Sequence, residues 1–409
     1  KKDYKAGEGY LGTKASHACI RVQAKPGEGG LNAYWLWTHL PYHTRILILD
    51  DPEERAAERS IVEENTPSLE PQKNADGWTV QTEKEETALN PADYAILTFG
   101  GDAVIGGRES YYGLAEGMPE ILRQQGLTHP FEQLESIFLA DDWTSVNLEC
   151  VLKDDAAGED KSKSWRFRGL TEYADLLPLS GIELVNVANN HTVDYGEAGY
   201  ASTLAALEGK VAVCGNGMNA VVEIKGHCFG FGGCRETTYL QDPEVIERDI
   251  RALKAQGAEF IIYQCHWGTE YSEHHNKLQE AMARRCARAG ADLVIGHHPH
   301  VVQGIDMIGD MPVIYSLGNL VFGGTLKLQT YDGLLLQAYF PLTGEKKQPT
   351  LKLIPILTSS QAENRINDYQ PTPAEGMNAK RILQTVQKDT AFRLSDELLI
   401  EEALLKRTP

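Results

Sequence analysis

The chain has few basic residues for its length. Its 409 residues include 39 Lys and Arg against 58 Asp and Glu, which gives a formal net charge of -19. Because a polyphosphate backbone attracts positively charged surfaces, this balance argues against nucleic acid as a general partner. An anionic ligand therefore has to be met by a local group of basic residues.

Cysteine is also scarce. The seven cysteines form no C-x-x-C pair, so neither a zinc knuckle nor a complete disulfide framework is indicated. Cys150, Cys228, Cys234 and Cys265 lie in apolar, strand-like runs, where a buried free thiol is the simplest interpretation.

Long hydrophobic runs are absent too. No window approaches the roughly 18 consecutive apolar residues that a membrane-spanning helix needs. The sequence begins at Lys1 without an initiator Met. We therefore expect that a leader or anchor segment has been removed and that the protein is exported.

Three regions differ in composition. Residues 1–92 are irregular and end in an acidic stretch, which we interpret as a small N-terminal subdomain and linker. Residues 93–345 have the composition of a packed main domain. Residues 346–409, with a Pro-rich stretch and a closing helical pattern, are expected to be an appendage packed on that domain.

In the main region, short runs of Val, Ile and Leu alternate with segments of helix length. This alternation is typical of βαβ units and predicts an α/β fold. The expected strands cover residues 95–99, 145–149, 183–188, 229–232, 260–265, 293–296 and 313–316.

Five of these strands end in side chains that can bind a metal. Ligands in open α/β sheets bind at the carboxyl ends of the strands, where the loops converge. The residues at these ends are Asp102, Asn147 with Glu149, the run Asn189-Asn190-His191, His266, and the run His297-His298-Pro299-His300.

Each motif alone also has a structural explanation. Gly-Gly before Asp102 is typical of a turn, and Asn147 with Glu149 could form an edge ion pair. His266 could be a core histidine, and the Asn-Asn-His run could cap a helix. His298-x-His300 favours metal binding by itself. Together the five strand ends predict one site, because independent coincidences would not place all of them at the same end of successive strands.

The order of these motifs resembles the calcineurin-like metallophosphoesterases and, more closely, the bacterial poly-γ-glutamate capsule-synthesis proteins. The resemblance covers about residues 95–322 and implies a layered α/β/β/α sandwich with small N- and C-terminal appendages. It rests on Gly101-Asp102, Asn147-Leu148-Glu149, residues 188–196, His266-Trp267-Gly268, His298-Pro299-His300 and residues 315–319.

By this resemblance the site would hold two divalent ions. Within it Glu149 would bridge the ions, and His191 and Asp194 would be the catalytic residues, with His191 as the general acid. Val104 stands where the phosphoesterases have a histidine, so the first ion would lack one imidazole. The implied ligands are Asp102, Glu149, Asn190, His266, His298 and His300.

Candidate substrate contacts come from residues near these motifs. Arg166 and Arg168 could grip a carboxylate or phosphate in bidentate fashion, although a surface ion pair explains them equally well. Tyr195 could stack or hydrogen-bond beside His191, or be a core tyrosine. Asn319, at the end of the last motif, is a further candidate.

The mixture of carboxylate, amide and imidazole ligands suits Mn, Fe or Zn better than an all-oxygen calcium cage.

The resemblance implies a capsule-synthesis accessory protein, membrane-anchored at the cell surface, that acts on poly-γ-glutamate or a phospho-ester beside membrane synthase subunits. Two alternatives stay open: a non-catalytic, polymer-binding scaffold subunit, and a generic metallophosphodiesterase. Retention of His191 favours an enzyme, whereas the missing first-motif histidine does not.

Overall fold

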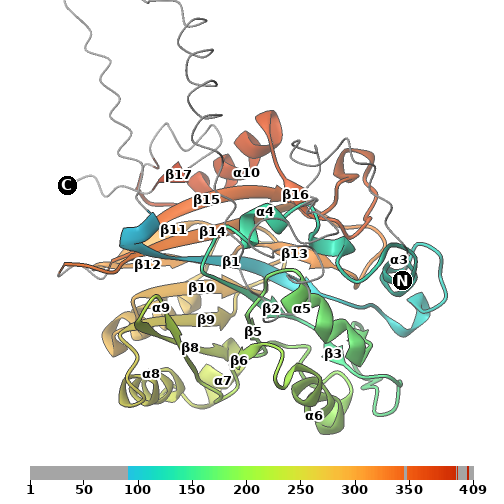
Figure 1. Cartoon of the computed structure of the whole chain (residues 1–409), viewed down its shortest axis with the longest axis horizontal. Coiled ribbons are helices and arrows are strands. Elements are labelled where there is room, and N and C mark those ends of the chain that lie inside the picture. The colour runs from blue at the N-terminus through green and yellow to red at the C-terminus, as the bar shows by residue number, and fades with distance from the viewer. Residues whose placement is uncertain (1–90, 345–347, 393, 395–402, 405–409) are drawn as a thin grey trace, which may run out of the picture. The chain divides into compact units, whose positions relative to one another are not determined.

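The structure is a computed structural model that describes residues 91–344, 348–392, 394 and 403–404. Its larger sheet has nine strands (Figure 1), and β1 lies in the middle of it. The strands are β1 (Tyr94–Val104), β2 (Trp143–Leu148), β5 (Leu184–Asn186), β6 (Ala212–Cys214), β13 (Asn319–Phe322), β14 (Asp332–Pro341), β15 (Thr350–Leu357), β16 (Thr372–Pro373) and β17 (Ala403–Leu404). The order is β16-β15-β14-β1-β2-β5-β6, with β13 paired to β1 and β17 to β15.

The smaller sheet has six strands in the order β11-β12-β10-β9-β8-β7. At its centre β8, β9 and β10 are parallel, so their carboxyl ends lie at one edge. Its strands are β7 (Ala220–Ile224), β8 (His227–Arg235), β9 (Phe260–His266), β10 (Leu293–His297), β11 (Ile305–Ile308) and β12 (Met311–Ile314). The short pair β3 (Val151–Leu152) and β4 (Arg168–Gly169) stands apart from both sheets.

The two sheets share one hydrophobic core. Phe340 of β14 packs edge-on against Phe229 and Phe260, with ring centroids 5.4 and 5.3 Å away. Alternate residues of β1, Ala95, Leu97 and Phe99, belong to this core. The described helices are α3 (Met118–Gln125), α4 (Glu135–Phe138), α5 (Leu176–Leu179), α6 (Gly196–Leu207), α7 (Glu236–Gln241), α8 (Val245–Ala255), α9 (Lys277–Ala289) and α10 (Gly376–Lys388).

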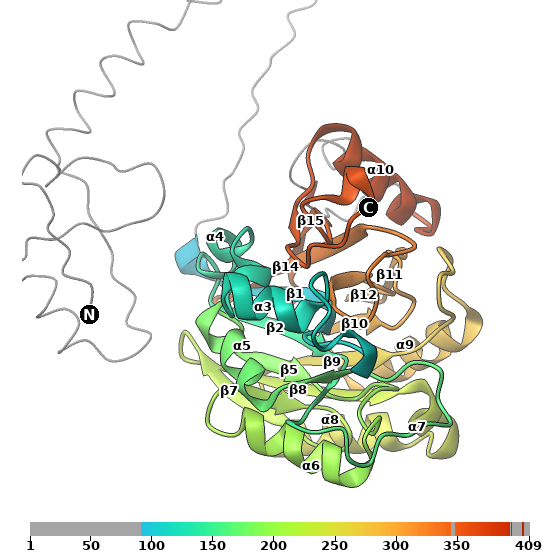
Figure 2. The ribbon, with the colours of Figure 1, turned by 90° about the vertical axis from the view of Figure 1, so that its right-hand side faces the viewer.

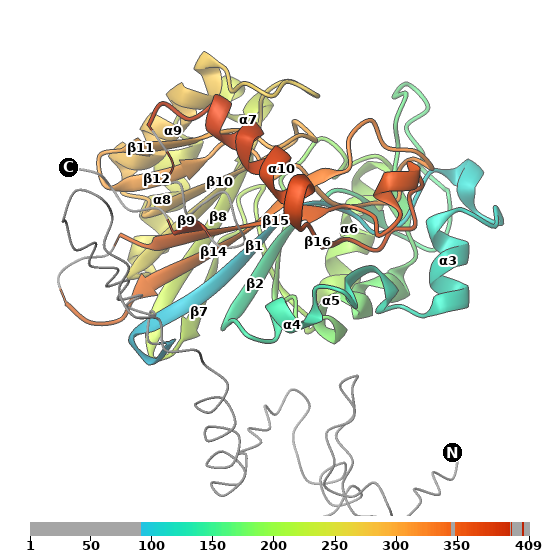
Figure 3. The same ribbon diagram turned by 90° about the horizontal axis from the view of Figure 1, so that it is seen from above.

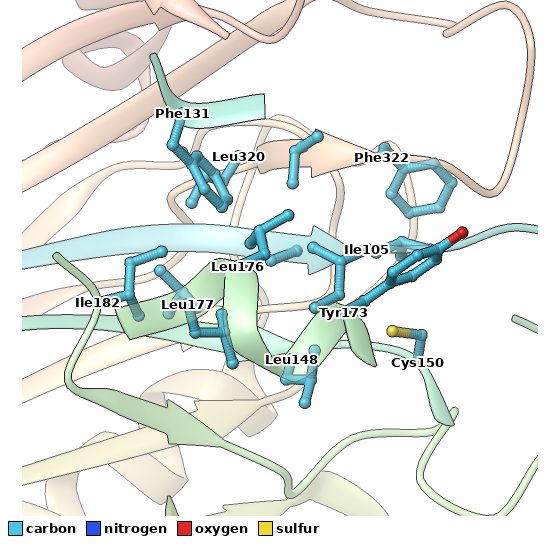
Figure 4. Close-up of a cluster of buried hydrophobic side chains, with 14 of the residues drawn as sticks. Ile105, Phe131, Leu148, Cys150, Tyr173, Leu176, Leu177, Ile182, Leu320 and Phe322 are labelled. Atoms are coloured by element: carbon cyan, nitrogen blue, oxygen red, sulfur yellow. The ribbon is translucent and has the colours of Figure 1, made fainter. Parts of the chain in front are cut away.

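Each sheet is covered by helices on its outer face, and the succession of layers can be followed in Figure 2. Leu176 and Leu177 of α5 pack with Leu148 and Leu320 on the larger sheet (Figure 4). On the other side, α8 and α9 pack on the smaller sheet through residues such as Ile250. The predicted α/β/β/α sandwich is confirmed.

All seven predicted strands fall within observed strands or overlap them. The region after residue 346, expected to be an appendage, contributes to the larger sheet, because β15 pairs with β14 over eight residue pairs. Figure 3 shows α10 lying across this part of the sheet. The expected N-terminal subdomain, residues 1–92, lies outside the described residues except at its very end.

Two smaller predictions also have an outcome. All six cysteines in the described part of the chain are free thiols, and all but Cys228 are buried. In the same part of the chain, no helix has both the length and the apolar character needed to cross a membrane.

Candidate metal centre

An irregularity in β1 places the first predicted ligand. The register of β1 against β2 shifts between Phe99 and Asp102, which leaves Asp102 opposite Asn147 on one side and Asn319 on the other. Gly101 makes this close approach possible, because a Cβ at this position would lie 2.0 Å from the carbonyl oxygen of Gly318. The buried Asp102 carboxylate is thereby fixed at the carboxyl end of the central strand.

The structure brings the predicted carboxylates and histidines together. Three groups of possible ligands stand out among the described residues, and within each group the ligand atoms lie within 4.8 Å of one another. The groups are Asp102, Glu149 and His300; Glu149, His266 and His298; and Glu270, His298 and His300. Since they share members, they form one continuous centre built from strand ends of both sheets.

Glu149 is the most informative residue of this centre. Its side chain is fully buried, yet neither carboxylate oxygen has a hydrogen-bond partner among the described residues. Oε1 lies 3.5 Å from Nε2 of His266, and Oε2 lies 4.0 Å from Nδ1 of His300. Burial and the charge of Asp102 raise the pKa of Glu149 well above its usual value. A buried carboxylate without donors is costly, and a cation between these residues would satisfy it.

Asp102 and His300 form the first half of the centre. His300 Nδ1 lies 3.3 Å from Asp102 Oδ2 and 3.0 Å from Asn319 Oδ1. Burial alone would lower the pKa of His300, but Glu149 and Asp102 outweigh it and raise that pKa to about 9. Burial likewise opposes ionisation of Asp102, but the contacts with His300 lower its pKa. Without a metal, a proton on His300 therefore supplies the positive charge that the carboxylates demand.

His266 and His298 form the second half. Burial lowers the pKa of His298 to about 4 and the pKa of His266 well below its usual value. Both imidazoles are therefore neutral near pH 7, which is the form that binds metals. Nδ1 of His298 is buried without a hydrogen-bond partner, and Nε2 of His266 lies 2.8 Å from Asn190 Oδ1. The predicted ligand Asn190 is thus placed beside His266.

Asn147 fixes the orientation of the Asp102 carboxylate by hydrogen bonding. Its Nδ2 donates to Asp102 Oδ1 at 2.8 Å, and its Oδ1 accepts from Nδ2 of Asn186 at 2.9 Å. This amide network fixes the Asp102 carboxylate before any ion binds, as outer hydrogen bonds do in metal sites.

The predicted catalytic pair lies at the edge of the centre. Nδ1 of His191 is 2.6 Å from Asp194 Oδ2, which also accepts the backbone N–H of Phe167 at 2.9 Å. Lys163 contacts Asp194 Oδ1 and donates to the carbonyl oxygen of Asn190 at 2.6 Å. The His191 ring packs on Phe167, with centroids 4.3 Å apart. Burial lowers the pKa of His191, although Asp194 acts in the opposite direction.

A cavity of about 460 Å³ opens beside these residues. Its lining combines polar groups of the centre with aromatic and aliphatic side chains and two lysines. Its lining includes Asn190, His191, Glu270, Tyr271, His300, Asn319, Lys163, Trp165, Phe167, Phe322, Lys327 and Leu328. The predicted candidate Asn319 therefore borders this cavity.

Three other predicted substrate contacts are paired with protein groups in the structure. The guanidinium of Arg168 is bonded to both carboxylate oxygens of Glu109, at 2.6 and 2.9 Å, and Arg166 donates to Glu159 at 2.9 Å. The hydroxyl of Tyr195 donates to Glu109 at 2.6 Å. None of the three lines the cavity. Their polar groups are already occupied, so they stabilise the loop around residues 153–169.

Sequence reasoning missed Glu270, Lys163 and Lys327. Glu270 lies four residues after His266, and the run Trp267-Gly268-Thr269 between them was a signal that this loop returns to the centre. The histidine absent from the first motif has no substitute on β1, because Val104 packs in the apolar core.

Gly296 should be essential for the position of the histidines that follow β10. A Cβ here would lie 1.9 Å from the carbonyl oxygen of Tyr315 and 2.6 Å from Nε1 of Trp267. We expect Gly296→Ala to lower the free energy of unfolding by roughly 1–3 kcal/mol, as overpacking does, and to weaken metal binding. Chemical denaturation and a metal titration measure both. Gly309→Ala, at an open turn, should leave metal binding unchanged; equal losses of metal affinity would contradict this role.

Residues 96–324 match the family described as bacterial capsule synthesis protein PGA_cap. The match covers more than half of the chain, and the chain belongs to this family. The matched segment begins in β1 and ends just after β13, so it includes every ligand of the centre.

Three relatives illustrate this similarity. The PGA biosynthesis protein CapA of Bacillus subtilis is 26% identical over 343 residues, which cover 77% of this chain and 83% of the relative. The capsule biosynthesis protein CapA of Bacillus anthracis is 26% identical over 345 residues, covering 77% and 78%. A probable polyglutamine synthesis accessory protein of Mycobacterium tuberculosis is 22% identical over 285 residues, covering 62% and 70%.

Proposed function

We propose that the chain is an accessory protein of poly-γ-glutamate capsule synthesis and that its centre is a two-metal hydrolase site. Family membership and the names of the relatives support the first part. The observation that carries the second is Glu149, a fully buried carboxylate with no donor for either oxygen among the described residues, set between three histidines and Asp102. Such a donor set fits divalent cations and fits an apolar structural role poorly.

The residues divide naturally between two ions. Asp102, Glu149 and His300 would hold one, and Glu149, His266 and His298 the other, with Asn190 beside His266. Carboxylate and imidazole ligands together suit Mn, Fe or Zn. When bound, such ions supply Lewis-acid polarisation of a substrate oxygen.

His191 supplies the proton in this proposal. Its Nδ1 is held by Asp194, which leaves the other ring nitrogen to donate to the leaving group at the cavity. Lys163 holds Asp194 in turn, so the chain of contacts fixes the direction of the ring. Phe167 shields one face of the imidazole from water.

The cavity suits an anionic chain. Lys327 places positive charge in it although the whole chain has a net charge of -19, whereas the charge of Lys163 is paired with Asp194. Ammonium groups attract carboxylates and phosphates alike. The apolar walls would pack against the methylene groups of a glutamyl residue.

The test compares metal-stripped protein with protein reloaded with Mn²⁺. Purified poly-γ-glutamate and an aryl phosphodiester are the two substrates, and chain length and released phenol are the readouts. We expect shortening of the polymer by the reloaded protein alone. Polymer binding without turnover would leave the non-catalytic scaffold subunit, and turnover of the phosphodiester alone would leave the generic metallophosphodiesterase.

We also propose that the protein works at the cell surface, anchored to the membrane beside capsule-synthase subunits. A capsule polymer is assembled there, and membership of a capsule-synthesis family supports the assignment. Fractionation of cells that carry the full-length protein, with protease treatment of intact cells, tests it: an antigen that stays protected from protease would contradict a surface location.

A further inference from the structure

We propose that Glu270 is an additional ligand of this centre, on the side of His298 and His300, and that it supplies the donor that Val104 cannot. The inference relies on the proposed function only in requiring that the centre binds divalent ions. Nothing in the family match or in the predicted ligand set assigns this role to Glu270.

The first support is distance. One carboxylate oxygen of Glu270 and one nitrogen each of His298 and His300 lie within 4.8 Å of one another. Oxygen and nitrogen donors lie about 2.0–2.2 Å from an ion such as zinc, so two donors of one ion are at most ~4.4 Å apart. For the ion that His300 would share with Asp102 and Glu149, the Glu270 oxygen therefore lies at most about 0.4 Å beyond that limit from the His300 nitrogen, a gap on the order of a side-chain adjustment.

The second support is a shared backbone conformation. Three residues around this group other than glycine have positive φ: Tyr271 at 60°, His298 at 99° and His300 at 58°. This conformation costs about 1–2 kcal/mol for each such residue. The N–H of Tyr271 donates to the carbonyl oxygen of Pro299 at 2.7 Å, which ties the two loops together. Strain of this kind persists where the surroundings impose it, and here it occurs in the two loops that carry Glu270 and the two histidines.

The third support is that the Glu270 carboxylate has no hydrogen-bond or ion-pair partner among the described residues. Its side chain is exposed and borders the cavity, and no hydrogen bond or ion pair of its carboxylate is recorded with any residue that the structure describes. Glu236, by contrast, has a hydrogen-bond partner in the loop that carries Glu270. Glu236 accepts the N–H of Gly268 at 2.9 Å and so fixes the start of the loop.

The position explains how the centre tolerates the missing histidine. Val104 is buried in the apolar core under the outer helices, so β1 offers only Asp102. Glu270 approaches from the smaller sheet, on the loop after β9. With Asp102 and Glu149 it would balance three of the four positive charges of two divalent ions, which leaves the cavity side net positive for an anionic substrate.

The experiment titrates metal-free protein with Mn²⁺ by calorimetry and with Co²⁺ by visible absorption. For Glu270→Gln we expect one ion to bind as in wild type, the other to bind more weakly by roughly 10–100-fold or more, and the Co²⁺ spectrum to change. Glu270→Asp keeps the charge but shortens the reach, so it should resemble Glu270→Gln. Glu273→Gln is the matched control, because Glu273 is half exposed and, within the described part of the chain, its ion pair is with Lys388 at 4.0 Å.

Unchanged stoichiometry, affinity and Co²⁺ spectrum in Glu270→Gln would overturn the inference while the proposed function stands. Wild-type behaviour of Glu270→Asp alone would also overturn it, because a long-range charge effect would then suffice. Failure of the wild type to cleave the polymer would reject the proposed hydrolase and leave this result intact, since the readouts are binding and absorption.

Discussion

Glu149→Gln should abolish two-ion binding and, at the same time, make the metal-free protein more stable. The carboxylate is buried and has no donor in the described structure, so its ionised form opposes folding. We expect a gain of about 1–2 kcal/mol in the free energy of unfolding at neutral pH. Wild type should be stabilised by about 4 kcal/mol at a thousandfold excess of metal over Kd, and the variant should lose most of this.

The pH dependence of this gain has a definite sign. The pKa of Glu149 is higher in the folded protein than in the unfolded chain. Its carboxyl group therefore does not lower the free energy of unfolding below the usual pKa of about 4.3. As the pH rises from there toward the pKa in the folded protein, it lowers the free energy of unfolding by an increasing amount. The advantage of Glu149→Gln should therefore vanish near pH 4.

Chemical denaturation with and without Mn²⁺ checks both statements. Glu109→Gln is a suitable control, because Glu109 is paired with Arg168 and Tyr195, and its loss should destabilise the protein under both conditions. A metal-free Glu149→Gln protein that is less stable than wild type at neutral pH would contradict this view of the centre.

His191→Ala should reduce turnover by roughly 10²–10⁴-fold, the usual contribution of a general acid. The metal content should not change, because His191 contacts Asp194 and Phe167 and belongs to none of the three ligand groups. Turnover of the polymer, measured together with elemental analysis of the variant, provides the check. A variant with wild-type activity would remove His191 from the mechanism.

The pH profile gives a second test of the same residue. Burial lowers the pKa of His191, so the protonated acid is lost at a lower pH than for a free histidine, and turnover should fall as the pH rises through that value. Asp194 raises this pKa. In Asp194→Asn the falling limb should therefore move to still lower pH, whereas an unmoved limb would mean that another group titrates.

The strand ends could be predicted from the sequence because β8, β9 and β10 are short apolar runs with clear helices between them. Parallel strands share an edge, so His266 and His298 had to lie close together. The partner strands β14 and β15 were not predicted. Most residues of β14 are buried because both faces of the strand pack in hydrophobic clusters, with Leu335 on one face and Leu334 and Leu336 on the other. Such a strand lacks the alternation that distinguishes a strand from a buried helix.

The ligands were easier to predict than the substrate contacts. Asp102 lies near the end of β1 and Glu149 directly follows β2, so local sequence places them. Arg168 is bonded to Glu109, which is 59 positions away, and no local pattern shows that its guanidinium is already paired. Glu270 was missed for the opposite reason, because an exposed acid in a loop resembles any solvated residue until His298 and His300 are placed beside it.

The most direct test of the account is a crystal structure of the protein grown with Mn²⁺ and recorded at the manganese absorption edge. We expect two anomalous peaks that share Glu149, one in contact with Asp102 and His300 and the other with His266 and His298. Absence of any peak bound to Glu149, or a Glu149 carboxylate hydrogen-bonded to protein donors instead, would contradict the claim that these strand ends form a metal centre.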